Sequence, residues 1–256
     1  MRAQREPFVS LRGVKQSFGE QKVLRGVDLD IYRGETLVLL GGSGGGKSVL
    51  MKHICGLLSP LEGTVIVEGE DISRKSEREL FSVRQKVSMM FQAGALFDSL
   101  SVGENIAFPL REKGGYREAE IQEKITQALE IVRLPGQGNK MPSELSGGMR
   151  KRVALARAVV EMPAMVLYDE PHAGLDPVTA DSIDHLIKDL QLEHGVTNIV
   201  VTHEMRSVFR IADRVVFMKE GEIYFDGTAK EFGSSDDELL MHFREGLSSR
   251  GEEWSE

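Results

Sequence analysis

One loop sequence organises the chain, and it reads Leu39-Leu40-Gly41-Gly42-Ser43-Gly44-Gly45-Gly46-Lys47-Ser48-Val49-Leu50. An apolar run over residues 36–40 leads into the loop, and apolar residues at helical spacing follow it over residues 49–57. A strand, a glycine-rich loop and a helix in this order are the context in which a Gly-x4-Gly-Lys-Ser pattern binds phosphate. The glycines let backbone N–H groups turn toward a phosphate chain, and the positive end of the helix dipole points at it.

The positions of this loop predict separate contacts with a nucleoside triphosphate. We expect Lys47 to reach the outer phosphates and the Ser48 hydroxyl to bind Mg²⁺. The residues expected to contact the nucleotide are Gly41, Gly42, Ser43, Gly44, Gly45, Gly46, Lys47, Ser48 and Val49. The sequence therefore predicts a nucleoside triphosphate site, with a merely flexible glycine loop as the alternative.

Length, charge and composition exclude several classes of protein. The chain has 256 residues, enough for one large α/β domain or two smaller lobes, and a formal net charge of −8. This acidity argues against a nucleic-acid partner. No apolar run approaches the ~20 residues that span a bilayer, and residues 1–6 lack the apolar core of a signal peptide. The single cysteine, Cys55, suits a reducing cytosol, and its spacing favours packing over a redox role.

Hydrophobic patterning predicts an α/β fold with a mostly parallel sheet. Alternation indicates strands within residues 7–31, and continuous apolar runs are typical of strands covered on both faces. Further strands are predicted at 35–40, 64–68, 87–91, 164–168, 197–201 and 213–218. Helical periodicity fits residues 47–57, 117–133, 147–161, 178–193 and 205–212.

The same patterning predicts how the chain is divided. Strand signal disappears between about residues 95 and 160, which indicates a helical lobe inserted into the core. We predict a main domain over residues 1–230 and an acidic extension over residues 231–256. The extension has an apolar stripe at helical spacing, made of Leu239, Leu240, Phe243 and Leu247. It is expected to pack on its own domain or on a second copy, and to end in a frayed tail.

A second element of a nucleotide site is a strand that ends in acids, and Met165-Val166-Leu167-Tyr168-Asp169-Glu170 fits this description. Open α/β sheets bind ligands at the carboxyl ends of their strands. We expect Asp169 to hold Mg²⁺ together with Ser48. Glu170 is then placed to orient or deprotonate an attacking water. The alternative is an ordinary pair of acids at the surface.

Two further segments complete a recognisable pattern: Ser143-Glu144-Leu145-Ser146-Gly147-Gly148-Met149-Arg150 and Val200-Val201-Thr202-His203-Glu204. With Gln92 after the predicted strand 87–91, the chain resembles the ATP-binding subunits of ABC transporters from about residue 7 to about residue 230. Five motifs agree in order and spacing. The resemblance implies a P-loop NTPase fold with a RecA-like core, an N-terminal antiparallel β subdomain and an inserted helical subdomain. It also implies ATP as the nucleotide and Mg²⁺ as the metal.

The resemblance implies a role for several single residues. Phe18 stands where the family stacks an aromatic ring on adenine, although a core phenylalanine is the alternative. Gln92 is similar to the residue that senses Mg²⁺ or the attacking water. His203 matches the histidine that contacts the γ-phosphate and holds the water and Glu170 in place. Asp176 matches an acid that acts across a dimer, and it also suits the N-cap of the helix that follows.

The signature motif of the family lies at Ser146, Gly147, Gly148 and Met149. Its hydroxyl and N–H groups are anion donors at a helix N-terminus. In the family they close on the γ-phosphate that the opposite subunit binds, so we expect hydrolysis to need two chains arranged head to tail. Met149 replaces the glutamine found in most members and cannot donate a hydrogen bond, but the remaining donors are expected to preserve activity.

The segments 87–97, 104–112 and 141–149 resemble one branch of the family, the MCE-type, Mla-like systems. These systems move phospholipids between the inner and outer membranes of Gram-negative bacteria, and methionine at the last signature position is usual in them. The resemblance implies a homodimer at the cytoplasmic face of the inner membrane. Its implied partners are an integral-membrane permease dimer, a periplasmic MCE-type lipid-binding protein and a small STAS-like protein.

Three residues of the predicted lobe, Leu96, Phe97 and Phe108, are candidates for a groove that receives the permease. Packing inside the lobe is the alternative for them. Two other functions stay open for the whole chain. One is an importer or exporter ATPase for another solute, such as an amino acid or a lipoprotein. The other is a soluble ABC protein without a transport role.

Overall fold

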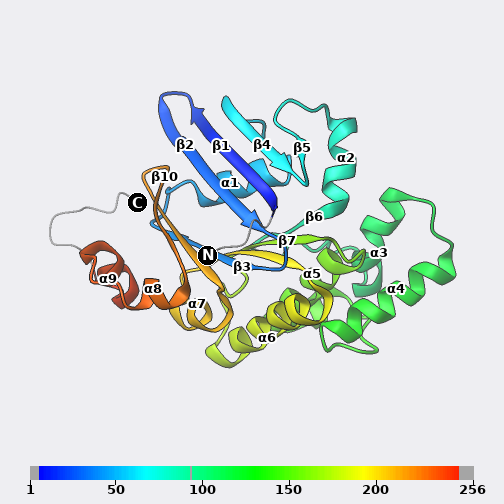
Figure 1. Ribbon diagram of the computed structural model, residues 1–256. Coiled ribbons are helices and arrows are strands. Elements are labelled where there is room, and N and C mark those ends of the chain that lie inside the picture. Colours follow the sequence, from blue (N-terminus) through cyan, green and yellow to red (C-terminus); the bar gives the residue numbers. More distant parts are fainter. Residues whose placement is uncertain (1–5, 93, 248–256) are drawn as a thin grey trace.

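The computed structural model describes residues 6–92 and 94–247, whose helices and strands are arranged as Figure 1 shows. The strands are β1 (Pro7–Phe18), β2 (Gln21–Tyr32), β3 (Thr36–Gly41), β4 (Glu62–Val67), β5 (Glu70–Asp71), β6 (Val87–Met90), β7 (Met165–Asp169), β8 (Thr197–Val201), β9 (Arg214–Lys219) and β10 (Glu222–Gly227). The helices are α1 (Lys47–Ile54), α2 (Glu77–Lys86), α3 (Val102–Lys113), α4 (Glu118–Ile131), α5 (Gly147–Val159), α6 (Pro177–His194), α7 (Met205–Ile211), α8 (Ala229–Gly233) and α9 (Glu238–Glu245), with one 3-10 turn, η1 (Pro142–Glu144).

The larger of the two sheets has six strands in the order β10-β9-β3-β8-β7-β6. The pairs β3–β8, β3–β9, β7–β8 and β6–β7 are parallel, and only the edge strand β10 is antiparallel. The prediction of a mostly parallel sheet is therefore confirmed. Because parallel strands end at the same edge, the chain leaves β3, β7 and β8 on one side of the molecule.

Successive residues of each central strand enter two different cores. In β3, Val38 and Leu40 belong to one buried cluster, whereas Leu37 and Leu39 belong to the other. Since both faces are covered, consecutive positions of such a strand are mostly apolar, and this explains the continuous runs in the sequence.

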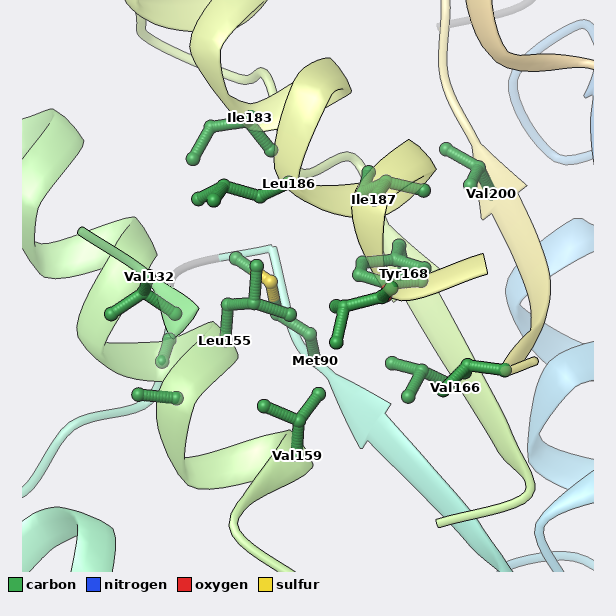
Figure 2. Packing of buried hydrophobic residues seen from close by; sticks show 14 of the residues in the cluster. Met90, Val132, Leu155, Val159, Val166, Tyr168, Ile183, Leu186, Ile187 and Val200 are labelled. Atoms are coloured by element: carbon green, nitrogen blue, oxygen red, sulfur yellow. The ribbon is translucent and has the colours of Figure 1, made fainter. Parts of the chain in front are cut away.

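The first face of the six-stranded sheet is covered by helices. Figure 2 shows Leu155 and Val159 of α5 and Ile187 of α6 near Val166 and Tyr168 of β7. The Tyr168 hydroxyl is completely buried and donates a hydrogen bond to Asn198 Oδ1 at 3.3 Å. Burial raises the pKa of Tyr168, so the phenol remains a neutral donor inside this core.

The second face is covered by α1 and by the four-stranded antiparallel sheet, whose order is β2-β1-β4-β5. One buried arginine connects the two sheets. Arg214 of β9 donates from Nη1 to the carbonyl oxygen of Asp30 in β2 at 2.7 Å, and from Nε to Asp226 Oδ1 in β10 at 2.5 Å. The antiparallel sheet is thus joined by a hydrogen bond to β9 of the six-stranded sheet.

Between β6 and β7 the described residues contain helices and no strand, as predicted for the helical lobe. The sequence patterns missed α2 and α3. α2 buries only Leu80 and Val83 among its ten residues, so its apolar stripe is short. α3 buries Val102, Ile106 and Leu110 at helical spacing, but Pro109 in its interior argues against an uninterrupted helix. The helix predicted over residues 47–57 ends earlier, at Ile54, because the N–H groups of Leu57 and Leu58 both turn back to the carbonyl of Lys52.

The C-terminal helices pack against their own chain. Leu240 of α9 is buried, and the Phe243 ring meets the Phe217 ring edge-on at 4.8 Å between centroids. Own-domain packing is therefore the observed alternative for residues 238–245, and the division predicted after residue 230 falls inside α8. The predicted frayed tail lies beyond Leu247, outside the described residues. None of the helices in the described part of the chain has the length and apolarity needed to cross a bilayer.

The turn between β9 and β10 supplies a test of how the two sheets are joined. Gly221 has a φ of 81°, and a Cβ atom there would lie 2.4 Å from the carbonyl oxygen of Val23. We expect Gly221→Ala to lower the free energy of unfolding by about 3 kcal/mol, because it combines left-handed strain with overpacking. Urea denaturation measures this loss.

The matched control is Gly195→Ala, at the glycine that directly follows α6. Gly195 has a φ of 68°, but a Cβ atom there would meet nothing within 4 Å. Its expected cost is only about 1 kcal/mol, from backbone strain alone. Equal losses in the two variants would contradict the close approach of β2 to the β9–β10 turn.

Candidate nucleotide-binding site

The glycine loop lies between β3 and α1 and is held closed by the lysine at its end. Lys47 is buried, and its Nζ donates hydrogen bonds to the carbonyl oxygens of Gly41 and Gly42, both at 2.8 Å. Burial lowers the pKa of Lys47, while the neighbouring carboxylates of Glu170 and Asp169 oppose that shift. The loop therefore surrounds the Lys47 ammonium group at the position where the sequence predicts a bound phosphate.

Two oxygen atoms meet at the start of α1 and the end of β7. The Ser48 Oγ donates to Asp169 Oδ1 at 3.4 Å. Burial raises the pKa of Asp169, the Ser48 hydrogen bond opposes this, and the charge of Glu170 adds to it. Mg²⁺ in nucleotide sites is usually held by one or two protein oxygens together with phosphate oxygens. This pair of oxygens fits that donor set.

The structure also brings together the predicted water-activating acid and the predicted histidine. His203 Nε2 lies 3.0 Å from Glu170 Oε1, and the backbone N–H of Glu170 donates to the carbonyl of Val201 at 3.0 Å. Glu170 has a φ of 48°, which is a strained conformation for a residue with a side chain. The strained residue is therefore the one whose carboxylate contacts His203.

Phe18 and Gln92 lie at the edges of this arrangement. Phe18 ends β1 and its exposed fraction is 51%, so the alternative of a core phenylalanine is wrong. Gln92 follows β6 with an exposed side chain, and its carbonyl oxygen accepts a hydrogen bond from Lys151 Nζ.

The signature residues and Asp176 form a second group, at the N-termini of α5 and α6. Ser146 is the N-cap of α5, and its Oγ accepts from the N–H of Met149 at 3.3 Å. A Cβ atom on Gly148 would lie 2.3 Å from Thr179 Cγ2, so the glycine lets α5 approach α6. Thr179 Oγ1 in turn donates to Asp176 Oδ2 at 2.5 Å.

Asp176 and Met149 have contacts within their own chain. Asp176 is the N-cap of α6, and the Thr179 hydrogen bond lowers the pKa of its carboxyl. The expected helix start is therefore confirmed. The Met149 side chain is partly buried against the core cluster that contains Val38 and Leu40, where an apolar side chain packs better than the glutamine expected from the resemblance.

A single chain thus contains two groups of predicted site residues, connected by the segment 170–176. The first group comprises the loop 41–49 with Asp169, Glu170 and His203, and the second comprises Ser146, Gly147, Gly148, Met149 and Asp176. Lys151 of α5 lies between them, since its Nζ donates to the carbonyl oxygens of Gln92 and, at 3.4 Å, of Glu170.

Sequence reasoning missed two buried polar residues near this segment, Lys151 and His172. A cation next to the signature and a histidine between two site acids were the available signals. Neither side chain has a partner close in sequence, and for this reason local patterns did not single them out.

Comparison with known proteins gives a consistent family. A family profile described as "ABC transporter" matches residues 24–173. The "Probable ribonucleotide transport ATP-binding protein mkl" of Mycobacterium leprae is 39% identical over 238 residues, which are 93% of this chain and 69% of that protein. The "Protein TRIGALACTOSYLDIACYLGLYCEROL 3, chloroplastic" of Arabidopsis thaliana is 40% identical, covering 93% of this chain and 74% of that protein. The "Intermembrane phospholipid transport system ATP-binding protein MlaF" of Haemophilus influenzae is 39% identical over 241 residues, covering 94% and 91% of the two chains.

Solved structures with the same fold are ATP-binding cassettes. A dimeric cassette in a post-hydrolysis state, bound to ADP and Pi, has a TM-score of 0.79 and 32% identity, covering 86% of this chain and 98% of that one. A cassette from Clostridium perfringens that is part of an ABC transporter complex has a TM-score of 0.83 and 29% identity, covering 93% and 95% of the two chains. The predicted fold, with its antiparallel sheet and inserted helices, is confirmed.

The strained backbone of Glu170 leads to a prediction about stability. We expect Glu170→Gly to be more stable than Glu170→Ala by about 1 kcal/mol, because glycine adopts a positive φ without a steric penalty. Both variants lack the carboxylate, so their difference reports the backbone alone. The two free energies of unfolding are compared by urea denaturation.

The neighbouring position 203 supplies the control pair. His203 is not among the described residues with positive φ. There the order is expected to reverse, with His203→Ala more stable than His203→Gly by about 0.5 kcal/mol. If alanine were the better residue at both positions, Glu170 would not be strained in the folded protein.

Proposed function

The chain belongs to the ABC transporter family and is an ATP-binding ATPase, and from this premise we propose that it powers phospholipid transport between two membranes through a separate permease. The contact of 3.0 Å between Glu170 and His203, next to the Lys47 loop, carries the hydrolytic part of the proposal. The phospholipid part is supported by the identity of 39% to the named phospholipid transport protein, along 94% of this chain.

The proposed reaction gives each of these residues a defined role. Lys47 exchanges the carbonyls of Gly41 and Gly42 for phosphate oxygens, and Phe18 stacks on the adenine. Water attacks the γ-phosphorus and passes a proton to Glu170, the bond to the β-phosphate oxygen breaks, and ADP and phosphate result. His203 holds the Glu170 carboxylate during this step and contacts the γ-phosphate.

The metal site of the proposal consists of Ser48 and Asp169, with Gln92 as an additional oxygen ligand. Mg²⁺ held there would neutralise part of the phosphate charge. The distance of 3.4 Å between Ser48 Oγ and Asp169 Oδ1 is short enough for both oxygens to bind one Mg²⁺.

The complete site is proposed to contain two copies of the chain. Ser146, Gly147 and Gly148 of one copy then donate hydrogen bonds to the nucleotide on the other copy, and Met149 supports the helix without donating. Asp176 lies beside them and contacts the opposite copy. The placement of the two residue groups on different elements, the sheet edge and the N-termini of α5 and α6, supports this arrangement, as does the dimeric form of the related cassette with ADP and Pi.

The proposed partners are a permease dimer, a periplasmic MCE-type protein and a small STAS-like protein, with the chain at the cytoplasmic face of the inner membrane. The helical lobe, about residues 95–160 within a domain of about residues 1–230, is proposed to contact the permease. Phe97 and Phe108 support this because both rings are exposed and lie 4.8 Å apart, with the Arg157 guanidinium 6.0 Å from the Phe97 ring. Leu96, by contrast, packs against the core of the lobe.

One observation favours a second candidate, transport of another solute. The relative from Mycobacterium leprae is also 39% identical, and its name assigns it to ribonucleotide transport. The hydrolytic chemistry is the same for both candidates, so only the partners and the transported molecule distinguish them.

The assignment of Glu170 is tested by Glu170→Gln. We expect this variant to bind ATP but to hydrolyse it at least about 100-fold more slowly, because a general base is removed. It should accumulate as an ATP-bound dimer in size-exclusion chromatography. Lys47→Ala is expected to lose nucleotide affinity instead, measured by titration with a fluorescent ATP analogue.

The matched control is Glu161→Gln, because the exposed fractions of the Glu161 and Glu170 side chains are 17% and 18%. Glu161 pairs with Lys113 away from the loop, so turnover should stay normal. Near-normal turnover in Glu170→Gln would remove Glu170 from its proposed role.

The transported molecule is tested by isolating the chain from its native membranes in mild detergent and identifying bound proteins and lipids by mass spectrometry. A permease, an MCE-type protein and enriched phospholipid together are the expected result. A permease with a solute-binding protein and no enriched lipid would favour the second candidate. An active ATPase without any membrane protein would overturn both transport assignments.

A further inference from the structure

Between Glu170 and Asp176 the chain carries a buried histidine, His172, that the hydrolytic chemistry does not use. Its Nε2 lies 2.7 Å from Asp184 Oδ1 of α6, and its Nδ1 lies 3.1 Å from Thr202 Oγ1 at the end of β8. The exposed fractions of His172, Asp184 and Thr202 are 7%, 2% and 0%. Polar side chains this deeply buried are stable only when each of them has a hydrogen-bond partner.

The directions of these hydrogen bonds follow from the neighbouring groups. The N–H of Glu204 donates to Thr202 Oγ1 at 3.1 Å, so the hydroxyl proton is free to be donated elsewhere. It is donated to His172 Nδ1, and the proton on Nε2 is then donated to Asp184. This assignment of protons comes from the hydrogen-bond network, and it gives each of the side chains of Thr202, His172 and Asp184 a hydrogen-bond partner.

This hydrogen-bond network joins the segment 170–176 to two other parts of the molecule that the proposed reaction uses. Thr202 directly precedes His203, which lies 3.0 Å from Glu170. Asp184 lies on α6, whose N-cap is Asp176.

Besides His172, the segment 170–176 is held by local backbone turns and by Leu175, which packs against the core cluster that contains Val38 and Leu40. Within the segment, the N–H of Ala173 returns to the carbonyl of Glu170 at 3.2 Å, and the N–H of Leu175 returns to that of His172 at 3.1 Å. These local turns determine its shape, whereas the His172 side chain connects that shape to β8 and α6.

We propose that His172 is a positioning residue that, through Thr202 and Asp184, fixes the Glu170–His203 pair relative to the Asp176 end of α6. Asp176 then moves together with Glu170 and His203 when two copies close on nucleotide. This inference rests on the proposed function for the roles of Glu170, His203 and Asp176. Since the network does not touch the Lys47 loop, its loss lowers turnover and leaves nucleotide affinity unchanged.

The first test removes the network with His172→Phe, which keeps the planar ring, and with Thr202→Val, which keeps the shape of threonine. Each is expected to lower kcat for ATP hydrolysis about tenfold, because small displacements of reacting groups have large effects on rate. The dissociation constant for ATP should stay within about twofold of the wild-type value, as expected when only steps after binding are affected. Thr202→Ser retains the hydroxyl and is expected to restore wild-type turnover.

A double variant shows whether the two residues act through one network. In His172→Phe/Thr202→Val the loss of kcat should equal that of a single variant, since residues in one hydrogen-bond network are not additive. Multiplied losses, or a loss of ATP affinity in either single variant, would overturn the proposal.

The control for loss of a buried imidazole is His53→Phe. His53 is also buried, and its Nδ1 lies 2.8 Å from the carbonyl oxygen of Leu58, far along the chain from the segment 170–176. We expect this variant to lose stability and to keep its kcat. If kcat fell to the same extent in both histidine variants, the effect of His172→Phe would be general destabilisation and the proposal would fail.

A measurement without ATP separates this inference from the proposed function. Amide hydrogen exchange in the nucleotide-free chain is expected to speed up in residues 170–176 and 202–204 together when His172 is replaced by Phe. Absence of ATP hydrolysis in the wild-type chain would remove the proposed function while this exchange result still stood. Unchanged exchange in both segments would overturn the positioning role, whatever the ATPase activity of the wild-type protein.

Discussion

Parallel pairing of β3, β8 and β7 is the constraint on which the site depends. Val201 of β8 lies opposite Leu39 of β3 and also opposite Asp169 of β7. β7 and β8 therefore end at one level and β3 ends two residues beyond it, so the glycine loop, Glu170 and His203 all leave the sheet at the same edge. Residues more than 120 positions apart in the sequence become neighbours, as in the contact between Ser48 and Asp169, whose separation is 121 positions.

The rigidity of the sheet accounts for the strained residue at its edge. Glu170 adopts a φ of 48°, and its N–H still donates to Val201 at 3.0 Å. Lys151 adds a hydrogen bond to the Glu170 carbonyl at 3.4 Å. Such a conformation costs about 1–3 kcal/mol and persists only where its surroundings impose it. The two buried cores on either side of the sheet supply that support.

Family membership and geometry describe different parts of this protein. The match to ABC transporters identifies an ATPase, and the phospholipid proposal follows from named relatives along nearly the whole chain. The structure adds that the site residues of one chain lie in two groups, one at the sheet edge and one at the N-termini of α5 and α6. It also shows a buried network through His172 in the segment between them.

The sequence by itself determined the glycine loop, the acid-ended strand, the continuous apolar runs of the central strands and the N-cap at Asp176, because each depends on residues that are neighbours along the chain. Only the tertiary structure decided that Phe18 is exposed, that α9 packs on its own domain and that His172 has two buried partners. Those partners lie 12 and 30 positions from His172 in the sequence. A local pattern contains no information about contacts over such separations, since they exist only after the strands have paired.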